Sequence, residues 1–168
     1  MKLEKLEYKR AQFENIDKMI DIINRCMKEV NYKDYKIEQF HKYLAAFTQD
    51  WLKDIIENRH YYEVWYGNEI IACGGVSRDY SQERQSYFTA IFVNPDYHGL
   101  GVGKELIHYL ESDEWCRDSN LIEVPSSKSS HGFYHKLGYE YRTIPPIFNE
   151  EDGSTIMFKD KQSISQTV

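Results

Sequence analysis

The chain has 168 residues, of which 41% are hydrophobic and 15% are aromatic, and its formal net charge at pH 7 is −6. A chain of this length is expected to form a single domain with its own core, and this composition argues against disorder. No run of lysine and arginine occurs, so the sequence does not predict a nucleic-acid partner. A negative surface favours a cationic ligand, although only weakly, because net charge says little about a pocket.

Cysteine usage and the first residues bear on the cellular compartment. Cys26, Cys73 and Cys116 are far apart, odd in number and without a CxxC pair, so we predict neither a disulfide framework nor a cysteine zinc site. This usage fits a reducing cytosol. The first ten residues, MKLEKLEYKR, lack the apolar core of a signal peptide, and no stretch approaches about 18 uninterrupted apolar residues. We therefore expect a cytoplasmic protein without a membrane partner.

The first third of the chain is predicted to contain one strand and two helical segments. Residues 3–10 alternate loosely and indicate an opening strand. Asn15 is a plausible N-cap for a helix over 16–30, whose apolar residues lie on one face that we interpret as core packing. After a polar break at 31–36, a second helical pattern covers 40–56 and either runs through or restarts midway.

A hairpin is predicted next. Residues 60–66 and 70–76 are rich in aromatic and β-branched residues, and Gly67 begins the turn between them. Gly74 and Gly75 lie inside the second strand and indicate a bulge or a close approach of the backbone.

A fourth strand is predicted at 87–93, after a polar loop at 78–85. The helix that follows it is expected to end near Trp115. Its acidic end is interpreted as a solvated face, made of Glu111, Asp113 and Glu114.

The remaining residues predict shorter elements. A buried strand at 121–124 precedes a short helix over 129–137, which ends at Gly138, a favourable residue just past a helix C-terminus. Two further strands, at 139–142 and 155–159, flank a long loop.

The order of strands and helices predicts a single α+β domain over residues 1–159 built around a mixed sheet. No repeat or linker divides it. Residues 160–168 are polar, and we expect this tail to be frayed.

The chain is organised around residues 87–110, YFTAIFVNPDYHGLGVGKELIHYL. The first seven carry no charge and indicate a buried strand, which Pro95 ends because proline lacks a ladder donor. Gly99, Gly101 and Gly103 then leave the backbone bare, so that several N–H groups can converge on one ligand. Because a helical pattern follows, the strand, loop and helix N-terminus together predict an anion site, most often for phosphate.

Two common phosphate-binding motifs fit these glycines poorly. A P-loop needs a glycine, four residues and then Gly-Lys-Ser/Thr, but His98 takes the place of the first glycine and Glu105 that of the hydroxyl residue. The Rossmann fingerprint needs GxGxxG directly after a strand, whereas this chain has GxGxG after a turn. Glu123 does lie near the acidic position of that fingerprint, so Rossmann-type dinucleotide binding stays as a minor alternative.

The glycine loop resembles that of the GCN5-related N-acetyltransferases, the GNAT family. The family motif is Gln/Arg-x-x-Gly-x-Gly/Ala after a strand that ends in a hydrophobic-x-Pro turn. This chain has Val93-Asn94-Pro95 and then HGLGVG at 98–103, with His98 in place of Gln or Arg.

A second segment is similar to the same family. The family motif N-x-x-A-x-x-F-Y-x-K-x-G-F/Y corresponds to SKSSHGFYHKLGY at 127–139, where Ser127 replaces the asparagine and Ser130 the alanine. Two motifs in the right order are more specific than one glycine loop. The resemblance extends over residues 60–160, and the earlier part agrees in layout alone.

The resemblance implies the GNAT fold, a central mixed sheet flanked by helices, and an acyltransferase that moves the acetyl group of acetyl-coenzyme A to an amine. It implies that the coenzyme pyrophosphate lies on the N–H groups of the glycine loop. It also implies that the central strand splays from the next strand, so that its free main-chain groups pair with the pantetheine arm. The residues expected to bind the coenzyme on these grounds are Ile91, Phe92, Val93, His98, Gly99, Leu100, Gly101, Val102, Gly103, Lys104, Ser127, Ser130 and Tyr134.

Tyr134 has the catalytic role that the resemblance implies. Without the motif it would be a half-buried tyrosine beside Phe133, but in the family this tyrosine lies near the coenzyme sulfur and protonates the leaving thiolate. The general base is open. Some members carry a glutamate where this chain has Tyr87, so Glu123 on the neighbouring strand and a water relay are the candidates.

Other side chains have weaker assignments. His131 and His135 are four apart on one helix, as metal pairs can be, but no third ligand is near in sequence, so we expect solvated histidines and no metal. By layout, Tyr32, Tyr35 and the loop around Phe148 are expected to form the pocket for a small-molecule or peptide amine.

Two expectations concern assembly and activity. A homodimer is expected from the family alone. The rival function is a catalytically silent acyl-coenzyme A sensor or docking module, which is favoured by His98 in the loop and by the missing strand glutamate.

Overall fold

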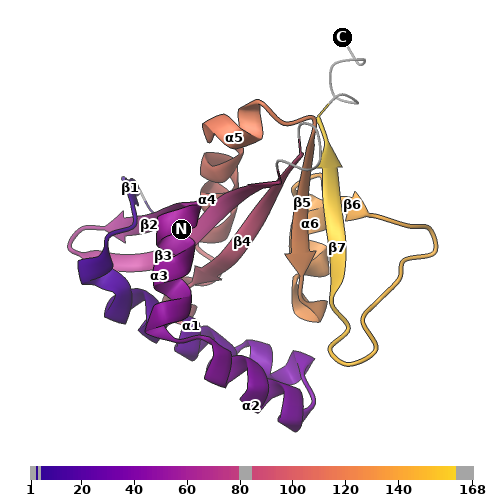
Figure 1. Ribbon diagram of the computed structural model, residues 1–168, viewed down its shortest axis with the longest axis horizontal. Helices are drawn as coiled ribbons and strands as arrows, with labels where there is room; N and C mark the ends of the chain where they lie inside the picture. The colour runs from indigo at the N-terminus through magenta and orange to yellow at the C-terminus, as the bar shows by residue number, and fades with distance from the viewer. Residues whose placement is uncertain (1–2, 4, 80–84, 162–168) are drawn as a thin grey trace.

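The computed structural model describes residues 3, 5–79 and 85–161, within which a seven-stranded mixed sheet carries helices on both faces (Figure 1). The strand order is β1-β2-β3-β4-β5-β7-β6. Only β4 and β5 pair in parallel among the described strands, and the other neighbours are antiparallel. This arrangement confirms the predicted α+β mixed sheet. It is not the mainly parallel sheet of a Rossmann fold, so the dinucleotide alternative has no support from the fold.

The strands agree with the predicted ones in order and differ at their ends. They are β1 (Glu7–Arg10), β2 (His60–Tyr66), β3 (Glu69–Asp79), β4 (Gln85–Val93), β5 (Leu121–Ser126), β6 (Glu140–Tyr141) and β7 (Thr155–Asp160). The opening strand begins later than predicted, while β3 and β4 extend into the predicted polar loop, of which residues 80–84 lie outside the described residues. β7 continues into the first residue of the predicted tail, and residues 162–168 lie outside the described part as well.

Six α-helices and four short 3-10 turns connect the described strands. The helices are α1 (Ile16–Glu29), α2 (Ile37–Ala46), α3 (Gln49–Asn58), α4 (Val102–Glu111), α5 (Glu114–Arg117) and α6 (His131–Lys136). The 3-10 turns are η1 (Phe13–Asn15), η2 (Asn31–Asp34), η3 (Pro95–Tyr97) and η4 (Lys128–Ser130). The pattern at 40–56 therefore restarts, because α2 ends at Ala46 and Thr48 then caps α3 by accepting from Trp51 N–H at 3.1 Å. No helix in the described residues is long and apolar enough to cross a membrane.

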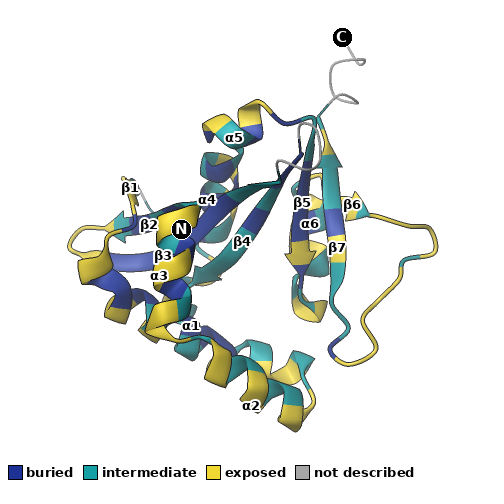
Figure 2. Cartoon of the chain, in the orientation of Figure 1, coloured by how far each residue is buried: buried dark blue, intermediate teal, exposed yellow. Residues whose placement is uncertain are grey.

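Two clusters of buried side chains hold the helices against opposite faces of the sheet (Figure 2). On one face, Met19 and Ile23 of α1 are fully buried in a cluster that also includes residues of α3. On the other face, Leu106 and Leu110 of α4 pack with residues of α6 and the sheet. Full burial of one such side chain contributes roughly 1.5–3 kcal/mol. The apolar stripe of α1 is therefore core, as predicted, over most of its length.

A bulge interrupts the pairing of β3 with β4, because Ala90 and Ile91 together lie opposite Gly74. Ala90 has a φ of 48°, a left-handed conformation that is uncommon for residues other than glycine. A Cβ on Gly74 would lie 3.1 Å from Ile91 Cγ1, and one on Gly75 would lie 2.6 Å from the Tyr61 ring. Both predicted features occur: the extra residue is in β4, and the glycines of β3 permit the close approach.

The acidic end of α4 is not the solvated face that we expected. Asp113 is 7% exposed and caps α5 by accepting from Trp115 N–H at 2.9 Å. The Tyr62 hydroxyl donates to it at 2.6 Å, and His60 Nδ1 lies 2.9 Å away. The helix therefore breaks before Asp113, because this carboxylate is buried with several partners. Glu114 alone of the acidic residues is exposed as predicted.

Asn15 lies at the N-cap of α1 but does not cap it with its side chain. Its amide instead donates to both oxygens of Glu63, at 3.1 and 3.2 Å. Glu63 is 1% exposed and also accepts from Gln12 N–H and Trp65 Nε1, each at 2.9 Å. Because a buried carboxylate needs donors, the Asn15 side chain, which was predicted to cap the helix, hydrogen-bonds to Glu63 instead.

Candidate functional site

The parallel pair β4 and β5 opens into a cavity. The strands pair at Gln85 with Leu121, through to Tyr87 with Glu123, and the pairing ends there although both strands continue. Figure 1 shows them diverging towards the bottom of the view. The cavity there has a volume of ≈ 830 Å³. Splaying leaves one side of β4 without a neighbouring strand, so its main-chain groups are open to a ligand.

Alternate residues at the end of β4 face this opening. Asn94 N–H donates to Ile71 O in β3 at 2.8 Å. Main-chain groups in an antiparallel pair point to alternate sides, so those of Val93 point away from β3 and those of Phe92, which pairs with Cys73, point towards it. Of the three strand residues expected to bind pantetheine, Ile91 and Val93 thus offer main-chain groups to the opening. Phe92 also lines the cavity, but its main-chain N–H and C=O point towards β3.

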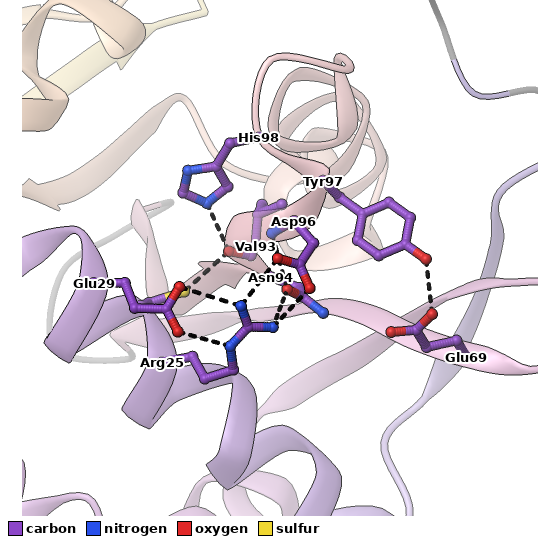
Figure 3. Close-up of polar contacts among 9 residues, drawn as sticks. Arg25, Glu29, Glu69, Val93, Asn94, Asp96, Tyr97 and His98 are labelled. Carbon is purple, nitrogen blue, oxygen red and sulfur yellow. Dashed lines mark hydrogen bonds and ion pairs between the residues drawn. The ribbon is translucent and has the colours of Figure 1, made fainter.

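The carbonyl of Val93 has two donors in this structure (Figure 3). His98 Nε2 lies 2.7 Å from this oxygen and is the donor, because a carbonyl can only accept. The Cys26 thiol also donates to it at 2.9 Å, and burial raises the pKa of that thiol to about 12. His98 therefore points back to the strand end rather than standing free over the glycine loop.

The glycine loop has the conformation and the open space that a phosphate needs. Gly99 and Gly101 have φ values of 76° and 84°, and a Cβ at either would meet nothing within 4 Å. These two glycines thus serve the backbone conformation and leave room for a ligand. The first bond of α4 runs from Glu105 N–H to Gly101 O at 3.1 Å. The N–H groups of the preceding turn have no acceptor inside the helix, and they carry the positive end of its dipole.

The turn between β4 and the glycine loop is tied to α1 (Figure 3). Arg25 donates to both carboxylate oxygens of Asp96, at 2.9 and 3.0 Å, and to Asn94 Oδ1 at 2.9 Å. It is held in turn by Glu29, four residues along the helix, at 2.8 Å. The Arg25 hydrogen bond lowers the pKa of the Asp96 carboxyl. Tyr97 in the same turn donates to Glu69 of β3 at 2.7 Å.

Tyr134 faces the cavity from α6. The residue is 6% exposed, and its hydroxyl makes no hydrogen bond with any described residue. Burial raises the pKa of this hydroxyl above its ordinary value, so it keeps its proton at neutral pH. Its ring packs at 5.1 Å from Phe133 and 5.8 Å from Tyr139. A protonated phenol with a free hydroxyl beside the strand opening is suited to donate a proton.

The serines of the second motif lie together at the start of α6. Ser127 Oγ and Ser130 Oγ are 2.7 Å apart, and both residues line the cavity. The histidines of this helix are partly buried rather than solvated, and they have separate partners. His131 bridges Ser126 Oγ at 2.9 Å and Gly153 O at 3.2 Å. His135 donates to Tyr139 O at 2.9 Å, and the described residues contain no group of three side chains that would hold a metal.

Among the residues expected to act in catalysis or to bind the coenzyme, Glu123 and Leu100 do not line the cavity. Glu123 is 8% exposed, and its Oε1 forms an ion pair with Arg142 Nε at 2.9 Å. A paired carboxylate outside the cavity is poorly placed to accept a proton there, so the structure gives the suggested base no support. Leu100 of the glycine loop is half-buried and also lies outside the cavity lining.

The cavity joins the other expected coenzyme residues, which come from three separate parts of the chain. Lys104 is exposed at its edge, where a positive charge would meet phosphate. The expected residues that line it are Ile91, Phe92, Val93, His98, Gly99, Gly101, Val102, Gly103, Lys104, Ser127, Ser130 and Tyr134.

The opposite wall of the cavity comes mostly from residues that the sequence did not mark as a site. Cys26, Met27 and Val30, at the end of α1, were interpreted as core or left unassigned. Of the expected acceptor residues, Tyr35 lines the cavity and Tyr32 does not. The loop around Phe148 contributes Asp152 to the lining, although Phe148 itself lies outside it. Three aromatic residues and one carboxylate complete this side of the cavity: Tyr43, Phe47, Trp51 and Asp152.

Comparison with known proteins agrees with this geometry. The model of the acetyltransferase (GNAT) family matches residues 16–139, so the chain belongs to that family. No curated protein sequence gives a significant match.

Solved structures share the fold at low sequence identity. The PaiA N-acetyltransferase of Thermoplasma acidophilum, in complex with coenzyme A, has a TM-score of 0.78 at 13% identity, covering 93% of this chain and 99% of that one. A GCN5-related N-acetyltransferase of Rhodopseudomonas palustris has a TM-score of 0.78 at 19% identity, covering 95% and 98%. The N-acetylglutamate synthase of Neisseria gonorrhoeae, with coenzyme A and N-acetyl-glutamate, has a TM-score of 0.69 at 11% identity, covering 95% of this chain and 36% of that one.

Proposed function

We propose that this protein is an N-acetyltransferase that moves the acetyl group of acetyl-coenzyme A to a primary amine by direct attack, without a covalent enzyme intermediate. The observation that carries the proposal is one cavity in which the splayed end of β4, the glycine loop and the Tyr134 hydroxyl meet. The two main-chain sites accept a phosphate and an extended amide chain, and the phenol supplies a proton in the same cavity.

The chain's own groups would hold the coenzyme in three places. The N–H groups at the start of α4 and the Lys104 ammonium hold the pyrophosphate. The main chains of Ile91 and Val93 pair with the pantetheine amides, as a neighbouring strand would. Ser127 and Ser130 line the cavity on the side of β5. When bound, the coenzyme supplies an acetyl thioester, whose carbonyl carbon the amine attacks.

The strand end and Tyr134 act on opposite sides of the reacting carbon. An N–H at the end of β4 donates a hydrogen bond to the carbonyl oxygen as that oxygen gains negative charge, a contribution of about 3 kcal/mol where single donors have been removed from enzymes. Tyr134 donates its proton to the departing sulfur as the C–S bond breaks, and the proton that the attacking nitrogen loses passes through water to the Tyr134 phenolate, so that the products are the amide and the free thiol. A free thiol has a pKa near 8.5. Burial raises the pKa of Tyr134, so the phenol is protonated at neutral pH, and the same burial disfavours a bare thiolate, which therefore draws the proton as the sulfur gains charge.

The test is a thiol-release assay with acetyl-coenzyme A and a panel of small amines, amino acids and peptides, together with calorimetric binding of acetyl-coenzyme A. Binding with turnover on at least one amine supports the proposal. Binding without turnover on any acceptor would favour the rival, an acyl-coenzyme A sensor or docking module. Absence of acetyl-coenzyme A binding would overturn both.

A further inference from the structure

Asp152 is a buried carboxylate without a cationic partner. It lies in the loop before β7, is 7% exposed and lines the cavity. Tyr43 donates to Oδ2 at 3.2 Å, and Ser154 N–H donates to Oδ1 at 2.8 Å. Within residues 5–79 and 85–161, no lysine, arginine or histidine forms an ion pair with it. Two dipolar donors offset the loss of water around a carboxylate only in part, so the site favours a positive charge.

Two tyrosine rings lie beside this carboxylate, and two further aromatic rings line the same cavity. The rings of Tyr35 and Tyr43 are 5.1 Å apart at 49°, and those of Phe47 and Trp51 are 4.9 Å apart at 55°. Burial, followed by the charges of Asp152 and Asp34, raises the pKa of Tyr35 to about 12. Tyr35 therefore stays neutral beside Asp152. The faces of aromatic rings attract cations, and the attraction grows when the cation leaves water.

We propose that Asp152, Tyr35 and Tyr43 form a subsite for a second cationic group of the acceptor, one that does not react. This inference rests on the proposed N-acetyltransferase function and names its substrate class: alkyl diamines and polyamines, in which one amine is acetylated and another stays charged.

The chemistry of attack explains why the bound cation is not the reacting nitrogen. An amine attacks only after it has lost its proton, because the ammonium has no lone pair. An ion pair with a buried carboxylate favours the ammonium form and would hold the reacting nitrogen inactive. Asp152 is therefore suited to anchor a distant ammonium group, while a second amine of the same molecule reaches the end of β4.

The experiment compares a straight-chain diamine with the monoamine of equal chain length. We measure kcat/KM for both with the wild-type protein, with Asp152→Asn and with Glu151→Gln. The last variant is the matched control, because it removes one negative charge from the exposed neighbour outside the cavity lining. Removing one partner of a desolvated charge pair is commonly costly, so Asp152→Asn should lower the preference for the diamine by roughly tenfold or more, mainly through KM. Glu151→Gln should keep the preference.

Three results would overturn the subsite. They are equal kcat/KM for diamine and monoamine in the wild-type protein, an unchanged preference in Asp152→Asn, and an equal fall of kcat on both acceptors. The last would make Asp152 the proton acceptor of the reaction instead. Acetyl-coenzyme A affinity and melting temperature check that Asp152→Asn remains folded, and Asp152→Glu, which keeps the charge, should restore part of the preference.

Failure of the proposed function is separable from failure of the subsite. If the protein turns over no amine, calorimetric binding of the diamine in the presence of coenzyme A still tests the subsite. Diamine binding that is lost in Asp152→Asn supports it without any turnover. No diamine binding to the wild-type protein overturns it.

Discussion

Arg25 in α1 donates a bidentate pair of hydrogen bonds to the Asp96 carboxylate in the turn after β4, at 2.9 and 3.0 Å (Figure 3). Because Asn94 accepts from the same guanidinium at 2.9 Å, one side chain fixes the turn that joins the end of β4 to the glycine loop. The planar fork of arginine matches a carboxylate in a way that lysine does not.

The first prediction concerns this contact. Arg25→Gln should weaken acetyl-coenzyme A binding by roughly tenfold, because two parts of one site lose their fixed spacing, an effect that preorganisation makes large. Calorimetric titration measures it. The matched control is Lys53→Gln, which removes an exposed cation that pairs with Asp50 at 3.9 Å, away from the cavity. Equal affinities of the two variants would show that the turn needs no tether.

The second prediction follows from the two donors on Val93 O. A carbonyl oxygen has two lone pairs, and His98 and Cys26 use both, so a pantetheine amide must displace one of them. His98→Ala should therefore tighten coenzyme A binding by roughly fivefold, since a typical hydrogen bond contributes about 1 kcal/mol. Weaker binding of coenzyme A to this variant, measured by titration, would mean that His98 contacts phosphate instead.

The third prediction tests the loop. Gly101→Glu should abolish coenzyme binding, because a carboxylate would occupy the place of the pyrophosphate. A control at another glycine of positive φ separates the loss of the pyrophosphate site from the backbone strain that any side chain would cause there. Gly67→Glu imposes the same change at another glycine of positive φ, 58°, with open space around it in the β2–β3 turn. Binding of coenzyme A should be lost in the first variant and kept in the second, with similar falls in melting temperature. Retained binding in Gly101→Glu would refute the loop assignment.

Most residues that were expected to bind the coenzyme line one cavity, and they could be selected from the sequence because their signals are local. The glycine loop, Tyr134 and the serines of the second motif need particular residue types at fixed spacing, and those spacings are visible in one chain. The same holds for the glycines of β3, where a missing Cβ signals a close approach.

The acceptor side was predicted only in part, through Tyr35 and the loop around Phe148, because it depends on contacts between distant segments. Tyr43 and Asp152 are 109 residues apart and meet across the cavity. In the sequence, Asp152 is one acid among several in a polar loop, and nothing local signals its burial. The prediction for Asp113 was wrong for the same reason, since its partners His60 and Tyr62 come from β2, which is distant in the sequence. Burial of single polar side chains is a tertiary property, which residue periodicity does not report.

The last prediction separates mechanism from packing at Tyr134. Tyr134→Phe keeps the ring and removes the proton, so the single-turnover rate should fall by roughly ten- to a thousand-fold, while acetyl-coenzyme A binding changes little. Because burial raises the pKa of Tyr134 above the ordinary 10.0, the protonated form persists as pH rises. The wild-type rate should therefore show no loss from deprotonation of Tyr134 up to about pH 10, the ordinary pKa of a tyrosine.

Tyr139→Phe is the control for this variant. Tyr139 is fully buried, its ring contacts that of Tyr134, and its hydroxyl donates to Glu111 at 2.8 Å outside the cavity. Losing that hydroxyl should lower the melting temperature and leave the single-turnover rate unchanged. If Tyr134→Phe behaves like Tyr139→Phe, with lower stability and an unchanged rate, then Tyr134 belongs to the core and another group protonates the sulfur. A large loss of acetyl-coenzyme A binding at an unchanged rate would make Tyr134 a coenzyme contact.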